Sequence, residues 1–205
     1  MPWIRGLVCL LLLGLPGFAA ADEIVWSAAR PLDWNDFRGR VPGGTDAENV
    51  AATAASLGWT YEYEFERSAS GCRYHVTAIR ATAIFHSESS WVKPGHETAA
   101  VLEHEQGHFD LTQVSRLMFE AQTRALVGMS GTCAGRNANR TSKRIAAEIT
   151  ARIEPIYEQI WQSHLALQER YDRDTRHGIA TDTQRNWNRS IAAGLRGQGW
   201  EQLQP

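Results

Sequence analysis

The sequence has few cysteines, almost no net charge and no long apolar segment beyond its start. It contains 3 cysteines in 205 residues, and its 21 basic side chains nearly balance 23 acidic ones. So small a net charge gives no electrostatic basis for a nucleic-acid partner. After the first 21 residues, no stretch approaches the roughly 18 apolar residues that a membrane-spanning helix needs. We therefore expect no nucleic acid as a partner and no integral membrane segment in the mature chain.

The first 21 residues have the layout of a cleaved secretory signal. One basic residue, Arg5, precedes an apolar run over residues 6–18, and three alanines follow. Removal of this signal peptide, residues 1–21, leaves residues 22–205. We expect these to form a single domain in the periplasm or outside the cell, and the sequence predicts no particular oligomeric state.

Two cysteines, Cys72 and Cys133, remain in the mature chain. In an oxidising compartment, two cysteines most simply form one disulfide. Closing so long a loop would stabilise the fold by roughly 4 kcal/mol if the effect is counted as lost chain entropy. The sequence therefore predicts a Cys72–Cys133 bridge.

Two segments have the patterns of paired β-strands. Apolar and polar residues alternate strictly from Leu57 to Phe65, which indicates a strand with one buried face. A turn follows at residues 68–71, and residues 72–85 are rich in Val, Ile, Thr and Tyr. The apolar positions of this second strand change from even to odd numbers near Ala78, which predicts a bulge. We expect the two strands to form an antiparallel hairpin.

The remaining two thirds of the chain are mostly helical in pattern. We predict a long helix over residues 97–127 and a second over residues 137–170, with a kink or break at Pro155. The tail from residue 171 onward is predicted to be loop, apart from a short helix around residues 182–193.

The most informative motif is His104-Glu105-Gln106-Gly107-His108, inside the first predicted helix. Positions four apart on a helix share a face, so His104 and His108 can both reach one metal ion. Glu105 lies one step round the helix, where a carboxylate suits the role of general base rather than ligand. The motif predicts a Zn²⁺ site. The expected fold is α+β, zincin-like, with a small antiparallel sheet packed on a long metal-binding helix and a second kinked helix.

A catalytic zinc site needs a third ligand, because such a zinc usually has three protein ligands and one open position. The segment from Tyr171 to Gly178 offers His177 as this ligand and Tyr171 as a hydrogen-bond donor to a developing oxyanion. Asp172 or Asp174 is suited to orient a ligand imidazole. Other carboxylates compete with His177 for the third position: Glu148, Glu154, Glu158 and Asp110.

Several residues together resemble the pattern of a known family. They are Ser90-Trp91-Val92-Lys93, His104-Glu105-Gln106-Gly107-His108-Phe109-Asp110, Tyr171-Asp172, Thr175, His177-Gly178, Gln184 and Trp187. With this set, the chain resembles a bacterial domain-of-unknown-function family that is described as secreted zinc-dependent proteases. The resemblance extends to Trp34 and Phe37, and so covers nearly all of the mature chain. It implies His104 and His108 as ligands and Glu105 as base, and it favours His177 as the third ligand.

The expected function is hydrolysis of a peptide bond in a peptide or protein substrate, assisted by zinc, outside the cytoplasm. Glu105 would take a proton from the attacking water and pass it to the leaving amine. Two alternatives stay open: a non-catalytic zinc-binding protein of the cell envelope, and an amidase that acts on cell-wall peptides. The other histidines of the mature chain are predicted to be structural or surface residues: His75, His86, His96 and His164.

Overall fold

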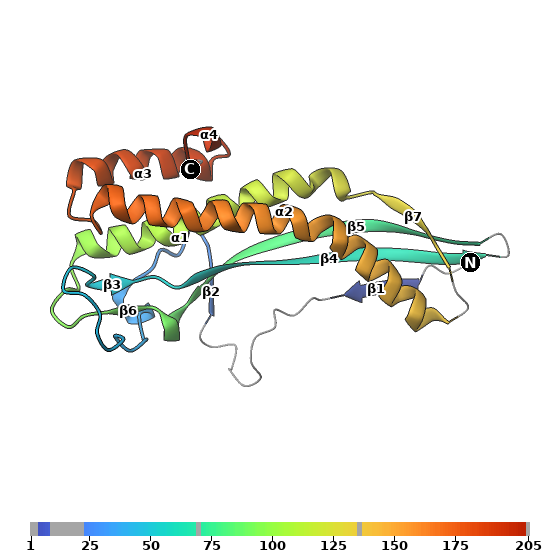
Figure 1. Ribbon diagram of the computed structural model, residues 1–205, viewed down its shortest axis with the longest axis horizontal. Helices are drawn as coiled ribbons and strands as arrows, with labels where there is room; N and C mark the ends of the chain where they lie inside the picture. Colours follow the sequence, from blue (N-terminus) through green and yellow to red (C-terminus); the bar gives the residue numbers. More distant parts are fainter. Residues whose placement is uncertain (1–3, 9–22, 69–70, 135–136, 204–205) are drawn as a thin grey trace. The chain divides into compact units, whose positions relative to one another are not determined.

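The computed structural model describes residues 4–8, 23–68, 71–134 and 137–203 (Figure 1). The strands are β1 (Ile4–Val8), β2 (Glu23–Val25), β3 (Ala51–Ala52), β4 (Ala55–Ser68), β5 (Gly71–His86), β6 (Trp91–Val92) and β7 (Ser130–Cys133). The α-helices are α1 (Ala99–Thr123), α2 (Ala138–Thr175), α3 (Thr181–Leu195) and α4 (Trp200–Leu203). The predicted α+β class is confirmed.

The main sheet carries β1, β4, β5 and β2 in that order, and β7 also pairs with β5. Its central strands, β4 and β5, are the predicted hairpin. β3 and β6 form a separate two-stranded antiparallel sheet. β1 lies within the predicted signal peptide, and the other residues of that segment lie outside the described ones. The signal peptide therefore stays a prediction.

The buried face of β5 changes register, as the sequence pattern predicts. Residues 72, 74 and 76 are buried in the first half of the strand, whereas residues 81, 83 and 85 are buried in the second half. Because side chains alternate between the two faces of a strand, a change from even to odd numbers needs a local irregularity between the halves.

Both long helices form, but α2 differs from the prediction. It runs through Pro155 without a break and continues to Thr175, five residues past the predicted end. Pro155 lies on the exposed face of α2, where a carbonyl that loses its helical partner can bind water instead. Of the predicted kink or break at Pro155, the break was therefore wrong, and the kink stays a prediction. Among the described residues, no helix is long and apolar enough to cross a membrane.

The start of the tail is also helical, contrary to the prediction that it is loop. Tyr171 and Thr175 lie in the last turn of α2, and both are buried. With Leu167 they form a buried i, i+4, i+8 row, which is the pattern of a helix packed on one side. The predicted short helix in the tail is confirmed as α3.

The chain forms two compact units. Of the described residues, the first contains 4–8, 59–68, 71–81, 119–134 and 137–160, and the second contains 23–58, 82–118 and 161–203. The single domain over residues 22–205 stays a prediction.

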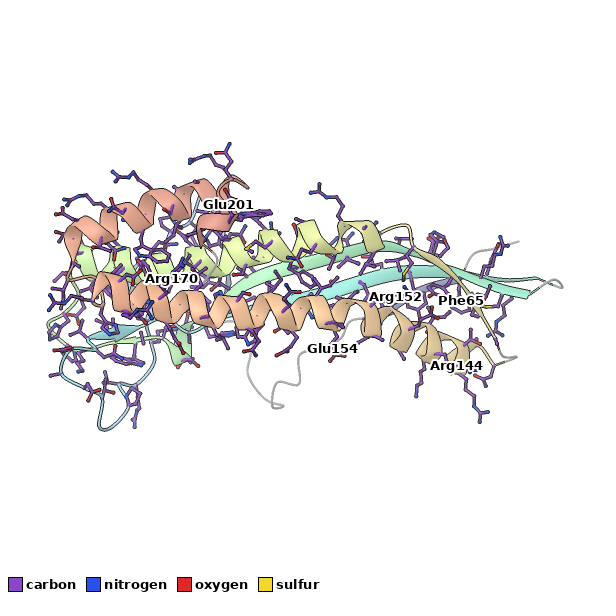
Figure 2. All side chains as sticks on the ribbon, turned by 45° about the horizontal axis from the view of Figure 1, so that its top comes forward. Phe65, Arg144, Arg152, Glu154, Arg170 and Glu201 are labelled. Atoms are coloured by element: carbon purple, nitrogen blue, oxygen red, sulfur yellow. A yellow bond between two sulfur atoms is a disulfide. The ribbon has the colours of Figure 1, made fainter. Side chains whose placement is uncertain are left out.

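In the first unit, the buried face of β4 packs on α2. The hydroxyl groups of Tyr61 and Tyr63 donate hydrogen bonds to the backbone carbonyls of Ala146 and Ser142, each at 3.1 Å. The exposed face of α2 carries charged side chains, among them Arg144, Arg152 and Glu154 (Figure 2). The alternating aromatic residues of β4 are therefore core, as predicted.

The predicted disulfide is present in this unit. Cys72 of β5 lies directly opposite Cys133 of β7, and the two Cα atoms are 4.8 Å apart. The bridge joins β5 to the strand that follows α1.

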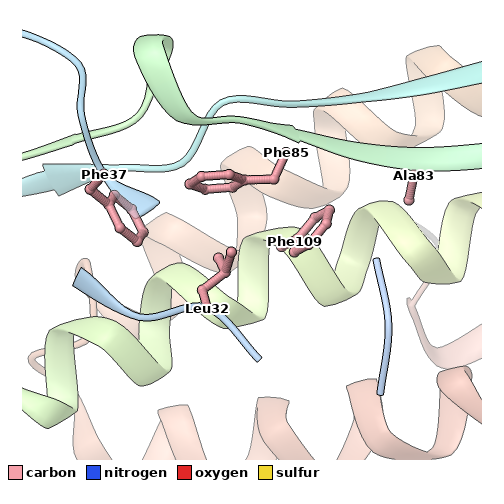
Figure 3. Packing of buried hydrophobic residues seen from close by; sticks show 5 residues of the cluster. All are labelled: Leu32, Phe37, Ala83, Phe85 and Phe109. Atoms are coloured by element: carbon pink, nitrogen blue, oxygen red, sulfur yellow. The ribbon is translucent and has the colours of Figure 1, made fainter. Parts of the chain in front are cut away.

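In the second unit, aromatic side chains hold α1 against the sheet and the N-terminal segment. Phe85 of β5 contacts Phe37 and Phe109, with ring centroids 5.2 and 5.7 Å apart (Figure 3). Leu32 and Ala83 complete this buried cluster. Since Phe109 directly follows His108, the cluster anchors α1 beside the histidine motif.

Candidate metal centre

α1 presents His104 and His108 to one place, as their four-residue spacing predicts. Their Nε2 atoms lie 3.2 Å apart, and the two rings meet edge to face with centroids 4.8 Å apart. His104 is 1% exposed, and the His108 side chain is 12% exposed. Two largely buried imidazoles with facing nitrogens can share one ion.

Asp172, in the last turn of α2, brings a carboxylate oxygen to both imidazoles. Its Oδ1 atom lies 3.1 Å from Nε2 of His104 and 2.9 Å from Nε2 of His108. Ligand atoms in a tetrahedral zinc site are about 3.3 Å apart, since the bonds to zinc are about 2.0–2.1 Å long. The three separations are close to that value. Among the described residues, these three side chains are the one group of His, Cys, Asp and Glu with metal-site geometry.

Glutamine side chains fix the protons of both imidazoles. Nδ1 of His104 lies 3.1 Å from Oε1 of Gln184 on α3, and Nδ1 of His108 lies 2.5 Å from Oε1 of Gln168 on α2. An amide oxygen can only accept a hydrogen bond, so the hydrogen-bond network assigns a proton to Nδ1 of each ring. Each Nε2 atom faces Oδ1 of Asp172, to which it donates while no metal ion is bound, and it can bind a metal ion through its lone pair once that proton is released.

The electrostatics of the group favour an ionised carboxylate. Burial alone would raise the pKa of Asp172, but hydrogen bonds from His104 and His108 and their charge hold it well below its usual range. Burial alone would lower the pKa of His108, but Asp172 and Glu105 raise it. When a metal ion displaces the Nε2 protons, one anionic oxygen and two nitrogen lone pairs converge on one point. This donor set fits a cation.

Glu105 is buried beside the group, and its carboxylate is held in place. Its Oε2 atom accepts a hydrogen bond of 2.7 Å from the hydroxyl of Thr53, in the segment between β3 and β4. Its charge raises the pKa values of both His108 and Tyr171, so the carboxylate lies near both. Glu105 is not one of the three grouped ligands.

A comparison with protein families finds one whose sequence profile matches this chain. The sequence profile of the family described as "Bacterial protein of unknown function (DUF922)" matches residues 33–178, which is more than two thirds of the chain. The chain belongs to this family. No curated protein and no solved structure matches it. In this DUF922 chain the grouped ligands and His177 all lie within the matched range, whereas Gln184 lies beyond it.

Tyr171 lies beneath His104 in this DUF922 protein and is fully buried. Its ring stacks on the His104 ring with centroids 4.7 Å apart, and its hydroxyl donates a 3.1 Å hydrogen bond to the His104 carbonyl. A Cβ atom on Gly107 would overlap that hydroxyl, so the glycine permits close packing of α1 on Tyr171. Burial raises the pKa of Tyr171, which keeps it neutral. These contacts favour a positioning role over the predicted oxyanion donor.

His177, the predicted third ligand, lies beside Asp172. Its Nδ1 atom is 3.3 Å from Oδ1 of Asp172, and its side chain is 40% exposed. It follows the end of α2 in a left-handed turn, with φ of 51° at Arg176 and 52° at His177. Gly178 continues this turn and packs against His104, where an added Cβ atom would lie 3.0 Å from that of His104. The structure therefore puts Asp172 nearest the two histidines and His177 behind it.

The other predicted alternatives lie outside the grouped ligands. Asp110 accepts hydrogen bonds of 2.7 Å from both the Trp26 indole and the Gln106 amide. Glu148 pairs with Arg152 one turn along α2, with its Oε1 atom 3.8 Å from a guanidinium nitrogen. Glu154 and Glu158 are exposed on α2, in the first unit.

Sequence reasoning gave no role to the two glutamines that hold the imidazoles. The signal for Gln168 was present, because it lies four residues before Asp172 and therefore on the same face of a helix. Gln184 belonged to the residues that carry the family resemblance, and it lies on the buried face of α3 with Trp187 and Ile191. The prediction that the chain becomes a loop at residue 171 hid the role of Gln168, because it ended the helix before Asp172, with which Gln168 shares a face.

Proposed function

We propose that this protein is a zinc-dependent hydrolase that cleaves peptide bonds. The observation that carries the proposal is the convergence of three ligand atoms, from His104, His108 and Asp172, beside the buried carboxylate of Glu105. Three protein ligands leave a position open on a four-coordinate ion, as catalysis requires.

His104, His108 and Asp172 would hold the ion. When bound, zinc supplies Lewis acidity that makes a water more acidic and polarises a substrate carbonyl. We assign the third position to Asp172 in place of His177, because Oδ1 of Asp172 is within 3.1 Å of both imidazole nitrogens. His177, with its Nδ1 atom 3.3 Å from Oδ1 of the same carboxylate, then limits the rotation of that carboxylate.

Glu105 serves as the general base in this proposal. It takes a proton from the attacking water as the oxygen bonds to the scissile carbonyl carbon. It then delivers that proton to the nitrogen of the leaving amine, and the bond between carbon and nitrogen breaks. The hydrogen bond from Thr53 holds one carboxylate oxygen, so the other stays available for the proton. Tyr171 supports His104 from below and does not contact the substrate.

The proposed location is the periplasm or the exterior of the cell. The Cys72–Cys133 disulfide fits an oxidising compartment. A peptide or protein is the proposed substrate in that compartment.

Metal content tests the binding part of the proposal. Purified protein analysed by mass spectrometry should contain about one zinc per chain, and Glu105→Gln should retain it. The control is Glu97→Gln, which changes an exposed carboxylate just before α1. Iron in place of zinc would contradict the assignment, because two histidines and one carboxylate also hold iron(II). Protein without any metal would contradict it entirely.

Activity tests the catalytic part. The wild type and Glu97→Gln should cleave unstructured protein substrates, whereas Glu105→Gln should lose turnover by about 100-fold or more. Cleavage of purified cell-wall peptides alone would indicate the amidase alternative. Zinc-loaded protein that cleaves neither substrate would indicate a binding protein.

A further inference from the structure

His164 is a buried histidine that the proposed chemistry does not use. It lies on α2, is 3% exposed, and stacks on Trp161 with ring centroids 5.0 Å apart. Its Nδ1 atom lies 3.0 Å from Oγ of Ser115 on α1, and its Nε2 atom lies 3.2 Å from Nε2 of Gln168. Both ring nitrogens therefore have partners, and one of them is the glutamine that holds His108.

A backbone carbonyl fixes the orientation of the Gln168 amide. One amide atom lies 3.0 Å from the carbonyl oxygen of His108 and 3.2 Å from Nε2 of His164. A carbonyl oxygen can only accept a hydrogen bond, so this amide atom is the nitrogen. The other amide atom, the oxygen, then faces Nδ1 of His108.

The same logic fixes the proton of His164. Its Nε2 atom faces an amide nitrogen, so it must accept and carries no proton. Ser115 donates its hydroxyl to the carbonyl of Leu111 at 3.1 Å, so its Oγ atom accepts from Nδ1 of His164. The ring is therefore neutral, with its proton on Nδ1. Burial, followed by the charge of His108, lowers the pKa of His164 to about 4, which agrees with a neutral ring at pH 7.

We propose that His164 is a positioning residue for the metal centre, acting through Gln168 on His108. By accepting from the amide nitrogen, it holds the amide oxygen on Nδ1 of His108. The proton on Nδ1 is thereby held, and Nε2 is kept as the nitrogen that faces Asp172 and can bind a metal ion. Without His164, the amide nitrogen has only the His108 carbonyl as an anchor. The link to metal affinity rests on the proposed function, but the proton positions do not.

The first test measures ring protons in metal-free protein at pH 7 by long-range nitrogen–proton NMR. His164 should carry its only ring proton on Nδ1. Free histidine in water provides the reference spectrum. A proton on Nε2 of His164, or an imidazolium, would overturn the proposal, because either form opposes the amide N–H of Gln168.

The second test replaces His164 with phenylalanine, which keeps a ring against Trp161 and removes both nitrogens. The side-chain amide protons of Gln168 should then exchange faster with water in the metal-free NMR spectrum, because the amide loses its partner at His164. Zinc affinity should fall by about threefold to tenfold, less than for a residue that contacts a ligand directly. The control is Ile153→Val, a cavity in the buried face of α2 within the first unit. It should lower the melting temperature and leave zinc affinity unchanged.

The outcomes separate this proposal from the proposed function. Protein that binds no zinc but shows the expected ring protons contradicts the function and retains the inference. Unchanged exchange of the Gln168 side-chain amide protons in His164→Phe overturns the inference, whatever the metal content. If His164→Phe does not fold, Ser115→Ala replaces it, because it removes only the acceptor of the His164 proton. His164 should then lose its single proton position, and an unchanged spectrum overturns the inference.

Discussion

The two histidines of the metal centre have similar but unequal supports. In each case the side-chain oxygen of a glutamine accepts a hydrogen bond from Nδ1 of the histidine. For His104, the nitrogen of Gln184 is fixed by the Tyr171 hydroxyl at 2.5 Å and by Asn188 at 2.8 Å. For His108, the glutamine nitrogen is instead fixed by the carbonyl of His108 itself and by a buried imidazole.

The two supports draw on different parts of the chain. The His104 support depends on α3, which lies beyond the matched family range and is tied to α1 by a 2.7 Å hydrogen bond from Asn188 to Glu103. The side chain of Trp187 on α3 packs between Tyr171 and the guanidinium group of Arg170. The His108 support lies entirely on α1 and α2. One imidazole is therefore held by a docked helix, and the other by the helix pair that carries the ligands.

Removing any one of the three proposed ligands should have the largest effect on zinc affinity, whichever of the two histidine supports remains intact. His104→Ala, His108→Ala and Asp172→Ala should each weaken zinc affinity by more than about 100-fold, since even residues that only support ligands contribute about 10–100-fold. Competition with a coloured chelator measures this. A much smaller loss for Asp172→Ala than for the histidine variants would contradict its assignment as the third ligand.

Acid should lower the stability of the folded protein through His164, the buried histidine in the support of His108. Its pKa of about 4 in the folded protein lies below the ordinary value of 6.5, so between these pH values the unfolded chain binds a proton that the folded chain does not. Stability of the metal-free protein should therefore fall as pH falls from about 6.5, by about 3 kcal/mol at pH 4. Above pH 6.5, His164 adds no pH dependence to the free energy of unfolding. Urea unfolding of the wild type and His164→Phe across this range isolates the contribution, and parallel curves would contradict it.

Replacing each glutamine with methionine should show how the supports differ. Gln168→Met and Gln184→Met keep the side-chain length and remove the amide, so each should weaken zinc affinity by about 10–100-fold. Gln184→Met should also loosen α3, because its nitrogen bonds to Asn188 on the same helix and to Tyr171. Hydrogen exchange should therefore increase over α3 in that variant alone. Equal hydrogen-exchange rates over α3 in Gln168→Met and Gln184→Met would contradict the difference between the two supports.

His177→Ala should have the smallest effect on metal binding. If His177 only restrains the Asp172 carboxylate, its loss should weaken zinc affinity by about tenfold or less. Isothermal titration on the same preparation as Asp172→Ala makes the comparison direct. A loss as large as that of the histidine ligands would restore His177 as the third ligand.

The sequence predicted what depends on local spacing. The four-residue interval of His104 and His108 needs only a helix, and the alternation in β4 needs only a buried face. The disulfide followed from having two cysteines in a chain that is expected to be exported. Each of these inferences uses neighbours in sequence or a choice with few alternatives.

The choice of Asp172 as the proposed third ligand could not be derived in this way. Asp172 and His177 are close in sequence, and which one reaches the histidines depends on where α2 ends. The helix continues through Pro155 and past Tyr171, and it stops at Thr175 before two left-handed residues. The buried row of Leu167, Tyr171 and Thr175 marks this extension, but Pro155 and the polar run after Tyr171 obscured it. The proton positions of the imidazoles depend on amides from α2 and α3, which only tertiary structure brings together.

The change of register in β5 makes the length of that strand matter. Tyr74 is buried at an even position and Phe85 at an odd one. Deleting one residue between Val76 and Ala81 would give Tyr74 and Phe85 positions of the same parity, so a regular strand would keep both side chains on the buried face. A change of two residues would leave their parity opposite, so the irregularity would still be needed. Relatives of this protein that are one residue shorter here should therefore have a β5 strand with a single, unbroken alternation.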